Sequence, residues 1–367
     1  MSKQRQSNFE LLRILAMLMI ILFHISLHGN IVKYFAKIPF SINKCWLYGL
    51  RSLGKVGVNI FVLISGYFLI NKNKISIPKI LKLWLHIVFY CVGIYLLFVG
   101  LGREPFEIKR FLITFLPITF NEWWFASTYF ILYLLSPFIN RFLKGLDKKD
   151  YKKLLIITTI MWSIIPTFLN TDLECGNLLW FIYLYALAGY INLYKDDFKT
   201  KPFKCFVVAF LFMIIGIAVS MTISWLMQKN MYWKELVFHI YNMETIISLV
   251  MAVSIFVAFK NINIKDNKII NTISASTFGI YLMHDHDFIR LFIWREFFKL
   301  KKFRKRLMFI PYSLGMAIVV FIFFSIIEII RIKFLEKYYM KLIYKINPKL
   351  ESIKNKIWES KIVKKVF

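Results

Sequence analysis

Near its start the chain carries an apolar stretch that also contains charge, residues 8–29, NFELLRILAMLMIILFHISLHG. A helix of about 20 apolar residues covers the roughly 30 Å hydrocarbon core of a bilayer, so this stretch predicts a membrane span. It includes Glu10, Arg13 and His24. Ionisable groups at this depth are costly, and they usually face protein or a water-filled cavity. The stretch therefore predicts a helix with a functional polar face.

Arg13 and His24 share that face. They are eleven residues apart, which is three helical turns to within about 20°, and about 16 Å along the axis. We expect them to line one continuous polar passage. Two structural alternatives stay open for either residue alone: Arg13 can extend its guanidinium to the headgroups, and a neutral imidazole can bind a nearby carbonyl. Glu10, one turn before Arg13, is interpreted as its local ion-pair partner.

The composition extends this interpretation to the whole chain. Of 367 residues, 59% are hydrophobic and 18% aromatic, with a mean hydropathy of +0.60. So much apolar surface excludes a soluble domain and predicts an all-α, polytopic transmembrane bundle. The first stretch lacks a small-residue cleavage site, so we interpret it as a retained span rather than a signal peptide. About ten spans are expected, at residues 9–28, 54–71, 80–101, 123–142, 153–170, 177–194, 204–227, 236–259, 271–296 and 307–331.

Lysine-rich loops predict the orientation. An even number of spans places both termini on one side, and the positive-inside rule makes that side cytoplasmic. We expect a ten-span membrane domain over residues 1–335 and a basic, amphipathic cytoplasmic tail over residues 336–367. The basic loop Lys299–Arg306 falls outside in this scheme. Either the ninth span re-enters the membrane or this loop meets an anionic substrate.

The net charge of +29 indicates the anionic leaflet or a negatively charged cofactor as partner, not nucleic acid. Lys72, Lys74 and Lys79 follow the second span, and they either set topology or bind phosphate. Within that span, Ser65 and Gly66 form a small step that favours close helix packing. The connections 31–55 and 103–122 are long enough for amphipathic surface helices.

Two later segments carry further candidates. Trp124 lies at the start of the fourth span, where an interfacial aromatic is the simpler interpretation. The ninth span contains Tyr281, His284 and Asp285 within FGIYLMHDH. Alternating His and Asp invites a metal site, but helical residues two apart point about 200° away from each other, so we expect no metal there. A carboxylate that orients one imidazole fits better, with His284 paired to a partner from elsewhere.

The remaining histidines and the cysteines suggest no further site. His28, His86 and His239 have no polar company in the sequence and are interpreted as structural or interfacial. Cys45, Cys91, Cys175 and Cys205 lack metal-ligand spacing and imply no disulfide framework.

Four segments together resemble the acyltransferase type 3 family of bacterial membrane acyltransferases. They are Arg13 followed by ten residues and His24, then VNIFVLISGYFL, WWFASTYFILYLLSPFIN and FGIYLMHDH. The resemblance implies transfer of an acetyl or other short acyl group from cytosolic acyl-coenzyme A to a sugar hydroxyl of a cell-surface polysaccharide or lipid-linked glycan. By the same resemblance His24 corresponds to the essential histidine, and Arg13 to the arginine that helps to hold the donor.

The chain departs from that family at two places. Lys72, Lys74 and Lys79 stand where many members carry arginines, and lysine lacks the bidentate fork. Tyr129 stands near a position that is often glutamate. We expect the lysines and Arg13 to bind the phosphates of acetyl-coenzyme A, His24 to act as general base, and Ser65 to be a possible oxyanion donor by its position.

The expected protein is thus an O-acetyltransferase of the bacterial plasma membrane. Its expected partners are lipid, acyl-coenzyme A and a glycan acceptor. A transporter or flippase for an anionic solute or lipid-linked sugar is the main alternative, since buried charges also line permeation paths. The chain shows no internal pseudo-repeat of the kind common in transporters. A membrane anchor for other envelope enzymes is a third possibility.

Overall fold

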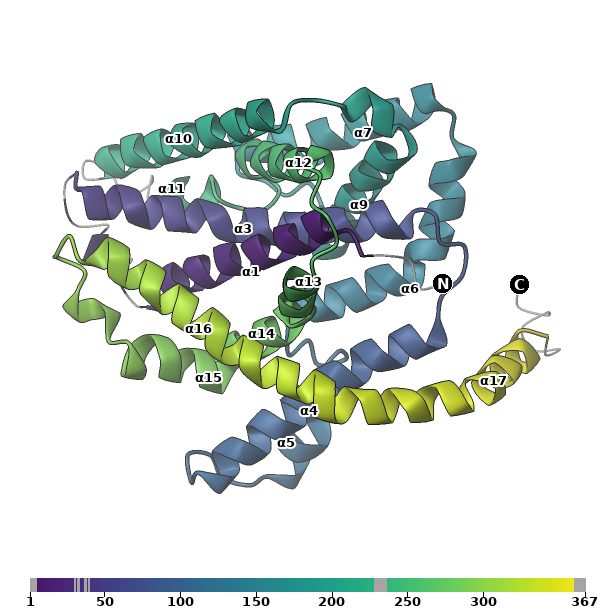
Figure 1. The fold of residues 1–367 in the computed structure, drawn as a ribbon. Helices are drawn as coiled ribbons and strands as arrows, with labels where there is room; N and C mark the ends of the chain where they lie inside the picture. The colour runs from purple at the N-terminus through teal and green to yellow at the C-terminus, as the bar shows by residue number, and fades with distance from the viewer. Residues whose placement is uncertain are drawn as a thin grey trace.

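The computed structural model describes residues 5–29, 31, 34–35, 38, 40–227 and 236–359. Every regular element in these residues is helical, so the prediction of an all-α fold is confirmed. The main α-helices, labelled in Figure 1 where there is room, are α1 (Ser7–His28), α3 (Ile42–Leu69), α4 (Ile77–Gly100), α5 (Ile108–Ile113), α6 (Trp124–Gly145), α7 (Lys148–Thr159), α8 (Ile165–Leu169), α9 (Asn177–Leu193), α10 (Pro202–Met227), α11 (Leu236–His239), α12 (Ile246–Asn261), α13 (Lys268–Ala275), α14 (Thr277–His284), α15 (Asp287–Leu291), α16 (Phe309–Arg331) and α17 (Lys337–Glu359).

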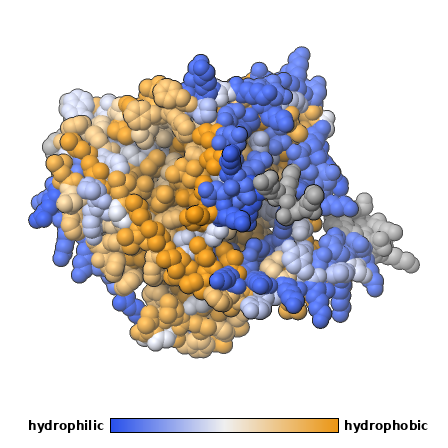
Figure 2. All heavy atoms as spheres, in the orientation of Figure 1, coloured by the Kyte–Doolittle hydropathy of each residue, from blue (hydrophilic) through white to orange (hydrophobic). Residues whose placement is uncertain are grey.

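Several of these helices are long and apolar enough to cross a bilayer. In the described residues six meet both criteria: Ser7–His28, Ile42–Leu69, Ile77–Gly100, Lys148–Leu169, Pro202–Leu226 and Phe309–Lys356. Two more apolar helices, α9 and α12, are shorter. A broad hydrophobic surface separates hydrophilic regions on two sides in Figure 2, as expected of a protein that faces lipid. The protein is therefore multi-pass, while the exact number of spans stays a prediction.

Two predicted spans are interrupted in the structure. The span expected at 236–259 is the short α11, a turn, and then α12, which Thr245 caps by accepting from Ser248 N at 3.5 Å. The span expected at 271–296 is divided among α13, α14, α15 and a π-helical turn. Polar residues cause the break after α14, because His286 accepts at Nδ1 from the backbone N–H of Phe288 (3.3 Å) and caps α15. Each of these two predicted spans is therefore built from several shorter helices.

Helix α3 begins twelve residues before the predicted second span. Ser41 caps it by accepting the backbone N–H of Lys44 at 3.2 Å, and the helix then continues to Leu69. Residues 42–55 are therefore the first half of a long, mostly buried helix rather than a separate surface helix. In the connection 103–122 the structure contains only the six-residue α5.

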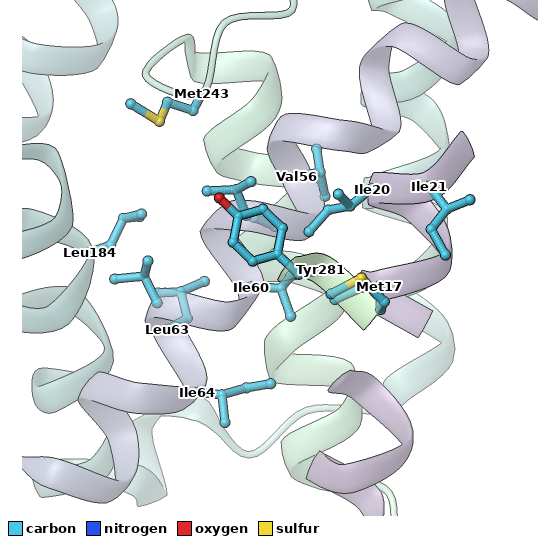
Figure 3. Close-up of a cluster of buried hydrophobic side chains, with 14 of the residues drawn as sticks. Met17, Ile20, Ile21, Val56, Ile60, Leu63, Ile64, Leu184, Met243 and Tyr281 are labelled. Carbon is cyan, nitrogen blue, oxygen red and sulfur yellow. The ribbon is translucent and has the colours of Figure 1, made fainter. Parts of the chain in front are cut away.

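Helix α1 lies in the middle of the bundle, in contact with α3, α12, α13, α14 and α16 (Figure 1). Glycines allow the backbones to approach. A Cβ on Gly57 would lie 2.6 Å from the carbonyl oxygen of Ala16 in α1, and one on Gly66 would lie 2.7 Å from that of Tyr185 in α9. The predicted close packing at the Ser65–Gly66 step is thus confirmed. Figure 3 shows the ring of Tyr281 among aliphatic side chains of α1 and α3.

Helix α16 continues through a π-helical turn (Ile332–Glu336) into α17. This long element crosses the bundle in Figure 1, so that the end of α17 and the start of α1 lie on the same side. The placement of both termini on one side of the membrane stays a prediction.

Candidate active site

His24 meets His284 in the interior of the bundle. His24 lies near the end of α1 and His284 is the last residue of α14, and both are buried. Nδ1 of His24 lies 2.9 Å from Nε2 of His284. The partner expected for His284 is therefore His24, brought together by the packing of α14 on α1.

A backbone carbonyl determines where the protons lie in this pair. Nδ1 of His284 is 2.6 Å from the carbonyl oxygen of Ile280, which can only accept. His284 must therefore donate from Nδ1, and in its neutral form it accepts at Nε2. The proton between the two rings then belongs to Nδ1 of His24. Neutral His24 consequently has its lone pair on Nε2, the atom that a general base needs.

Asp285 supports the same imidazole. Its Oδ1 lies 3.5 Å from Nδ1 of His24 and 3.6 Å from Nε2 of His28. The carboxylate would stabilise positive charge on His24 whenever that ring takes a second proton. The supporting roles predicted for His284 and Asp285 thus have a geometric basis. His28, which was interpreted as structural or interfacial, lies beside the same carboxylate.

The same three side chains have the spacing of a possible cation site. Ligand atoms of His24, His28 and Asp285 all lie within 4.8 Å of one another. However, Nδ1 of His24 is already within hydrogen-bond distance of His284, and a proton there excludes a metal ion at that atom. That proton leaves Nε2 of His24 as the atom at which a metal could still bind, and the absence of a metal from the reaction stays a prediction.

His24 lines a cavity of about 400 Å³, here called the His24 cavity. Its polar and charged lining consists of His24, His28, Arg51, Lys55, Trp124, Tyr281, Asn242, Asp285 and Arg290. The ammonium group of Lys55 lies over the ring of Trp124 in a cation–π contact, with Nζ 4.9 Å from the ring centroid. The buried hydroxyl of Tyr281 has no hydrogen-bond partner among the described residues. Trp124 and Tyr281 thus both border the space in front of His24.

Arg13 lines a second cavity of about 510 Å³, the Arg13 cavity. Nη1 of Arg13 donates to both carboxylate oxygens of Glu10 (2.9 and 3.0 Å), and Glu10 also accepts from the Ser274 hydroxyl at 2.5 Å. The interpretation of Glu10 as the ion-pair partner of Arg13 agrees with this geometry. Ser65 lines the same cavity and donates to the carbonyl oxygen of Phe61 at 2.9 Å. Ser65 is therefore not next to His24, as an oxyanion donor would have to be.

Of the three predicted lysines, only Lys79 lines the Arg13 cavity, together with Lys82 and Arg5. Lys72 and Lys74 are exposed and are not part of its lining. Lys82 forms an ion pair with Glu336. Among the described residues, Lys79 and Arg5 are thus the cations of this cavity that have no acidic partner within 4 Å.

The two cavities share a wall of three aromatic side chains, Phe61, Phe125 and Phe278. These come from α3, α6 and α14, and the rings of Phe61 and Phe125 are 6.3 Å apart. Arg13 and His24 thus line two adjoining cavities that meet at these rings, and one continuous passage between the two residues stays a prediction. We call these three rings the aromatic partition.

A second polar cluster was missed by sequence reasoning. Glu328 of α16 is fully buried and accepts from Tyr90 (2.5 Å) and twice from Arg331 (2.8 Å each). Nε2 of His86 lies 3.1 Å from Glu328 as well, which agrees with the interpretation of His86 as a structural residue. Because Arg331 also binds Glu336, this network fixes the junction of α16 and α17 against α4. His86 and Glu328 form part of the wall of the Arg13 cavity.

Arg51 and Lys55 were also missed, because Arg51 lies before the predicted second span, which began at residue 54, and Lys55 lies at its very start. Their spacing of four residues was the available signal, since it places both on one face of a helix. Both line the His24 cavity from α3.

Comparison with known proteins agrees with this architecture. A family model described as an acyltransferase domain, that of the acyltransferase type 3 family, matches residues 6–329. Comparisons with curated proteins and with solved structures give no significant match. The matched segment contains all of α1 and α14 and thus the whole His24 cluster. The chain therefore belongs to the acyltransferase type 3 family and is a membrane acyltransferase.

Proposed function

We propose that this protein transfers an acetyl or other short acyl group from acyl-coenzyme A to a hydroxyl of a cell-surface polysaccharide or lipid-linked glycan, in a bacterial plasma membrane. The observation that carries the proposal is the hydrogen-bonded chain from Ile280 through His284 to His24. It leaves Nε2 of a buried imidazole free beside a cavity. An acyltransferase needs such a base to take the proton of the attacking hydroxyl.

The proposed reaction uses His24 twice. Nε2 takes the proton of the acceptor hydroxyl while the hydroxyl oxygen forms a bond to the thioester carbonyl carbon. Asp285, 3.5 Å from Nδ1 of His24, stabilises the imidazolium that forms. When the carbon–sulfur bond breaks, the same proton passes from His24 to the departing thiolate. The products are an ester and free coenzyme A, and the enzyme returns to its starting state.

Tyr281 is better placed than Ser65 to stabilise the oxyanion. Its hydroxyl is buried without a partner among the described residues, and the residue borders the His24 cavity. A donor that is pre-oriented and desolvated contributes most where negative charge develops. Ser65 instead donates its proton within its own helix, on the other side of the aromatic partition.

The donor's phosphates fit the Arg13 cavity. Lys79 and Arg5 have no acidic partner within 4 Å in the described part of the chain, whereas Arg13 is already held by Glu10. A polyanionic coenzyme A would meet these cations, and Arg13 can turn its remaining guanidinium N–H groups to a phosphate while it keeps Glu10. The thioester would then reach His24 at the aromatic partition.

The test uses the purified protein in lipid nanodiscs, radiolabelled acetyl-coenzyme A and glycan from cells that lack this protein. We expect label to enter alkali-labile ester on the glycan, and His24→Ala to abolish it while membrane insertion is unchanged. His239→Ala is the matched control, because His239 borders neither cavity and binds the carbonyl oxygen of Pro166 instead. Full ester formation by His24→Ala would contradict the catalytic role. Solute flux into liposomes without label on any acceptor would favour a transporter.

A further inference from the structure

Two cations on α3 line the His24 cavity without an acidic partner. Arg51 and Lys55 are one helical turn apart, and both are partly buried. Nε of Arg51 is fully buried and has no hydrogen-bond partner among the described residues. The mechanism proposed above uses neither residue.

The other charges of this cavity are already engaged. Arg290 forms an ion pair with Asp287 at 2.7 Å, and Asp285 faces His24 and His28. No carboxylate in the described part of the chain lies within 4 Å of Arg51 or Lys55. The acids that act on Lys55, Glu244 and Asp285, do so from farther away. The cavity thus carries an excess of positive charge beside its general base.

Aromatic rings hold these cations in place. The guanidinium carbon of Arg51 lies 4.7 Å from the ring centre of Phe238 and 5.5 Å from that of Phe23. Nζ of Lys55 lies 4.9 Å from the ring centre of Trp124. Ring faces attract a cation but accept few of its N–H bonds, so the hydrogen-bonding capacity of both groups remains available. A guanidinium and an ammonium one turn apart can hold a carboxylate or a phosphate between them.

We propose that Arg51 and Lys55 bind an anionic group, a carboxylate or a phosphate, carried by a substrate into the His24 cavity. The inference rests on the proposed function and defines its substrate class. The anionic group has two possible sources. The acceptor glycan can carry it as a uronic acid or a phosphate, or the acyl group can carry it as the free carboxylate of a dicarboxylic acid.

The experiment compares ligands that differ only in charge. The acceptor probes are methyl β-glucuronide, which is anionic, and methyl β-glucoside, which is neutral. The donor probes are succinyl- and acetyl-coenzyme A. For each pair we measure binding to the detergent-solubilised full-length protein by calorimetry and, separately, the rate of acyl transfer. The binding measurement needs no turnover, so absence of transfer would refute the proposed function while the binding data still decide this inference.

We expect wild-type protein to prefer the anionic member of one pair by about tenfold or more, as one charge-assisted contact provides. Arg51→Gln and Lys55→Gln should each remove most of that preference and leave affinity for the neutral member unchanged. The control is Arg304→Gln, because Arg304 stacks on Tyr34 in the same way, 4.3 Å from its ring centre, and does not line the cavity. It should keep the wild-type preference.

Preference within the acceptor pair assigns the anion to the glycan, and preference within the donor pair assigns it to the acyl group. Equal binding within both pairs would overturn the proposal. It would also be overturned if Arg51→Gln weakened the binding of free coenzyme A and altered neither preference, because Arg51 would then serve the donor's phosphates. Gel filtration of each variant checks that it is folded.

Discussion

Replacing His284 with leucine should slow the chemical step without weakening donor binding. The substitution removes the acceptor 2.9 Å from Nδ1 of His24, which leaves a buried N–H without its partner. An unsatisfied buried donor costs about 1 to 3 kcal/mol. It also removes the contact that keeps the lone pair of His24 on Nε2, so part of the population would hold the wrong tautomer.

The structure sets limits on the size of this effect. Asp285 lies 3.5 Å from the same nitrogen and can partly replace His284 as the acceptor of its proton. Since each 1.36 kcal/mol is a tenfold change in rate, we expect kcat to fall by about 10- to 100-fold. That is a smaller loss than for His24→Ala. KM for acetyl-coenzyme A should not change, because His284 does not line the Arg13 cavity.

Initial rates of acetyl transfer, measured over a range of donor concentrations, provide the test. His284→Gln is the matched variant, since a glutamine amide can donate to Ile280 and accept from His24 as the neutral imidazole does. It should cancel at least half of the increase in activation free energy that His284→Leu causes. The reasoning is refuted if His284→Leu keeps kcat within threefold of wild type, or if only its KM changes.

Three further predictions concern packing, the partition and metals. Gly57→Ala should lower the free energy of unfolding by about 1 to 3 kcal/mol, because its Cβ would lie 2.6 Å from the backbone oxygen of Ala16. The control is Gly93→Ala, because a Cβ there meets no atom within 4 Å, and it should keep or raise the melting temperature in thermal denaturation. Equal melting temperatures for Gly57→Ala and Gly93→Ala would contradict the packing argument. Phe125→Ala removes one ring of the aromatic partition and so makes room for a longer acyl chain. It should raise kcat/KM for butanoyl-coenzyme A relative to acetyl-coenzyme A at least about fivefold, and an unchanged ratio would show that the partition does not select the acyl chain. Prolonged dialysis against a chelator should leave activity unchanged, because the proposed reaction uses the imidazole of His24 as its base and needs no metal ion. Loss of activity that zinc restores would contradict this prediction.

The helical character of the chain and the importance of α1 could be predicted because they depend on local signals. Apolar length predicts a membrane helix, and a spacing of eleven residues places Arg13 and His24 on one face whatever surrounds them. The pairing of His24 with His284 depends on how α1 packs against a helix about 260 positions away, which no local pattern determines. The sequence could indicate an oriented imidazole but not its partner.

Hydropathy also misplaced the limits of two important elements. Residues 271–296 are apolar enough for one span, but hydropathy does not register that the polar residues around Asp285 end one helix and cap the next. In α3 the opposite occurred, because Arg51 and Lys55 lower the local hydropathy although the helix continues through them. The second error hid two functional candidates, since a charge inside a helix resembles a loop when only average hydropathy is considered.

Helix α3 touches every part of the proposed site. Arg51 and Lys55 face the His24 cavity, Phe61 belongs to the aromatic partition, and Ser65 borders the Arg13 cavity. These positions lie on one uninterrupted helix that is anchored closely to α1 and α9. A ligand in one cavity that tilts or shifts α3 would therefore also change the shape of the other cavity. By thermodynamic reciprocity, any such influence of the donor on acceptor affinity must be matched by an equal influence of the acceptor on donor affinity.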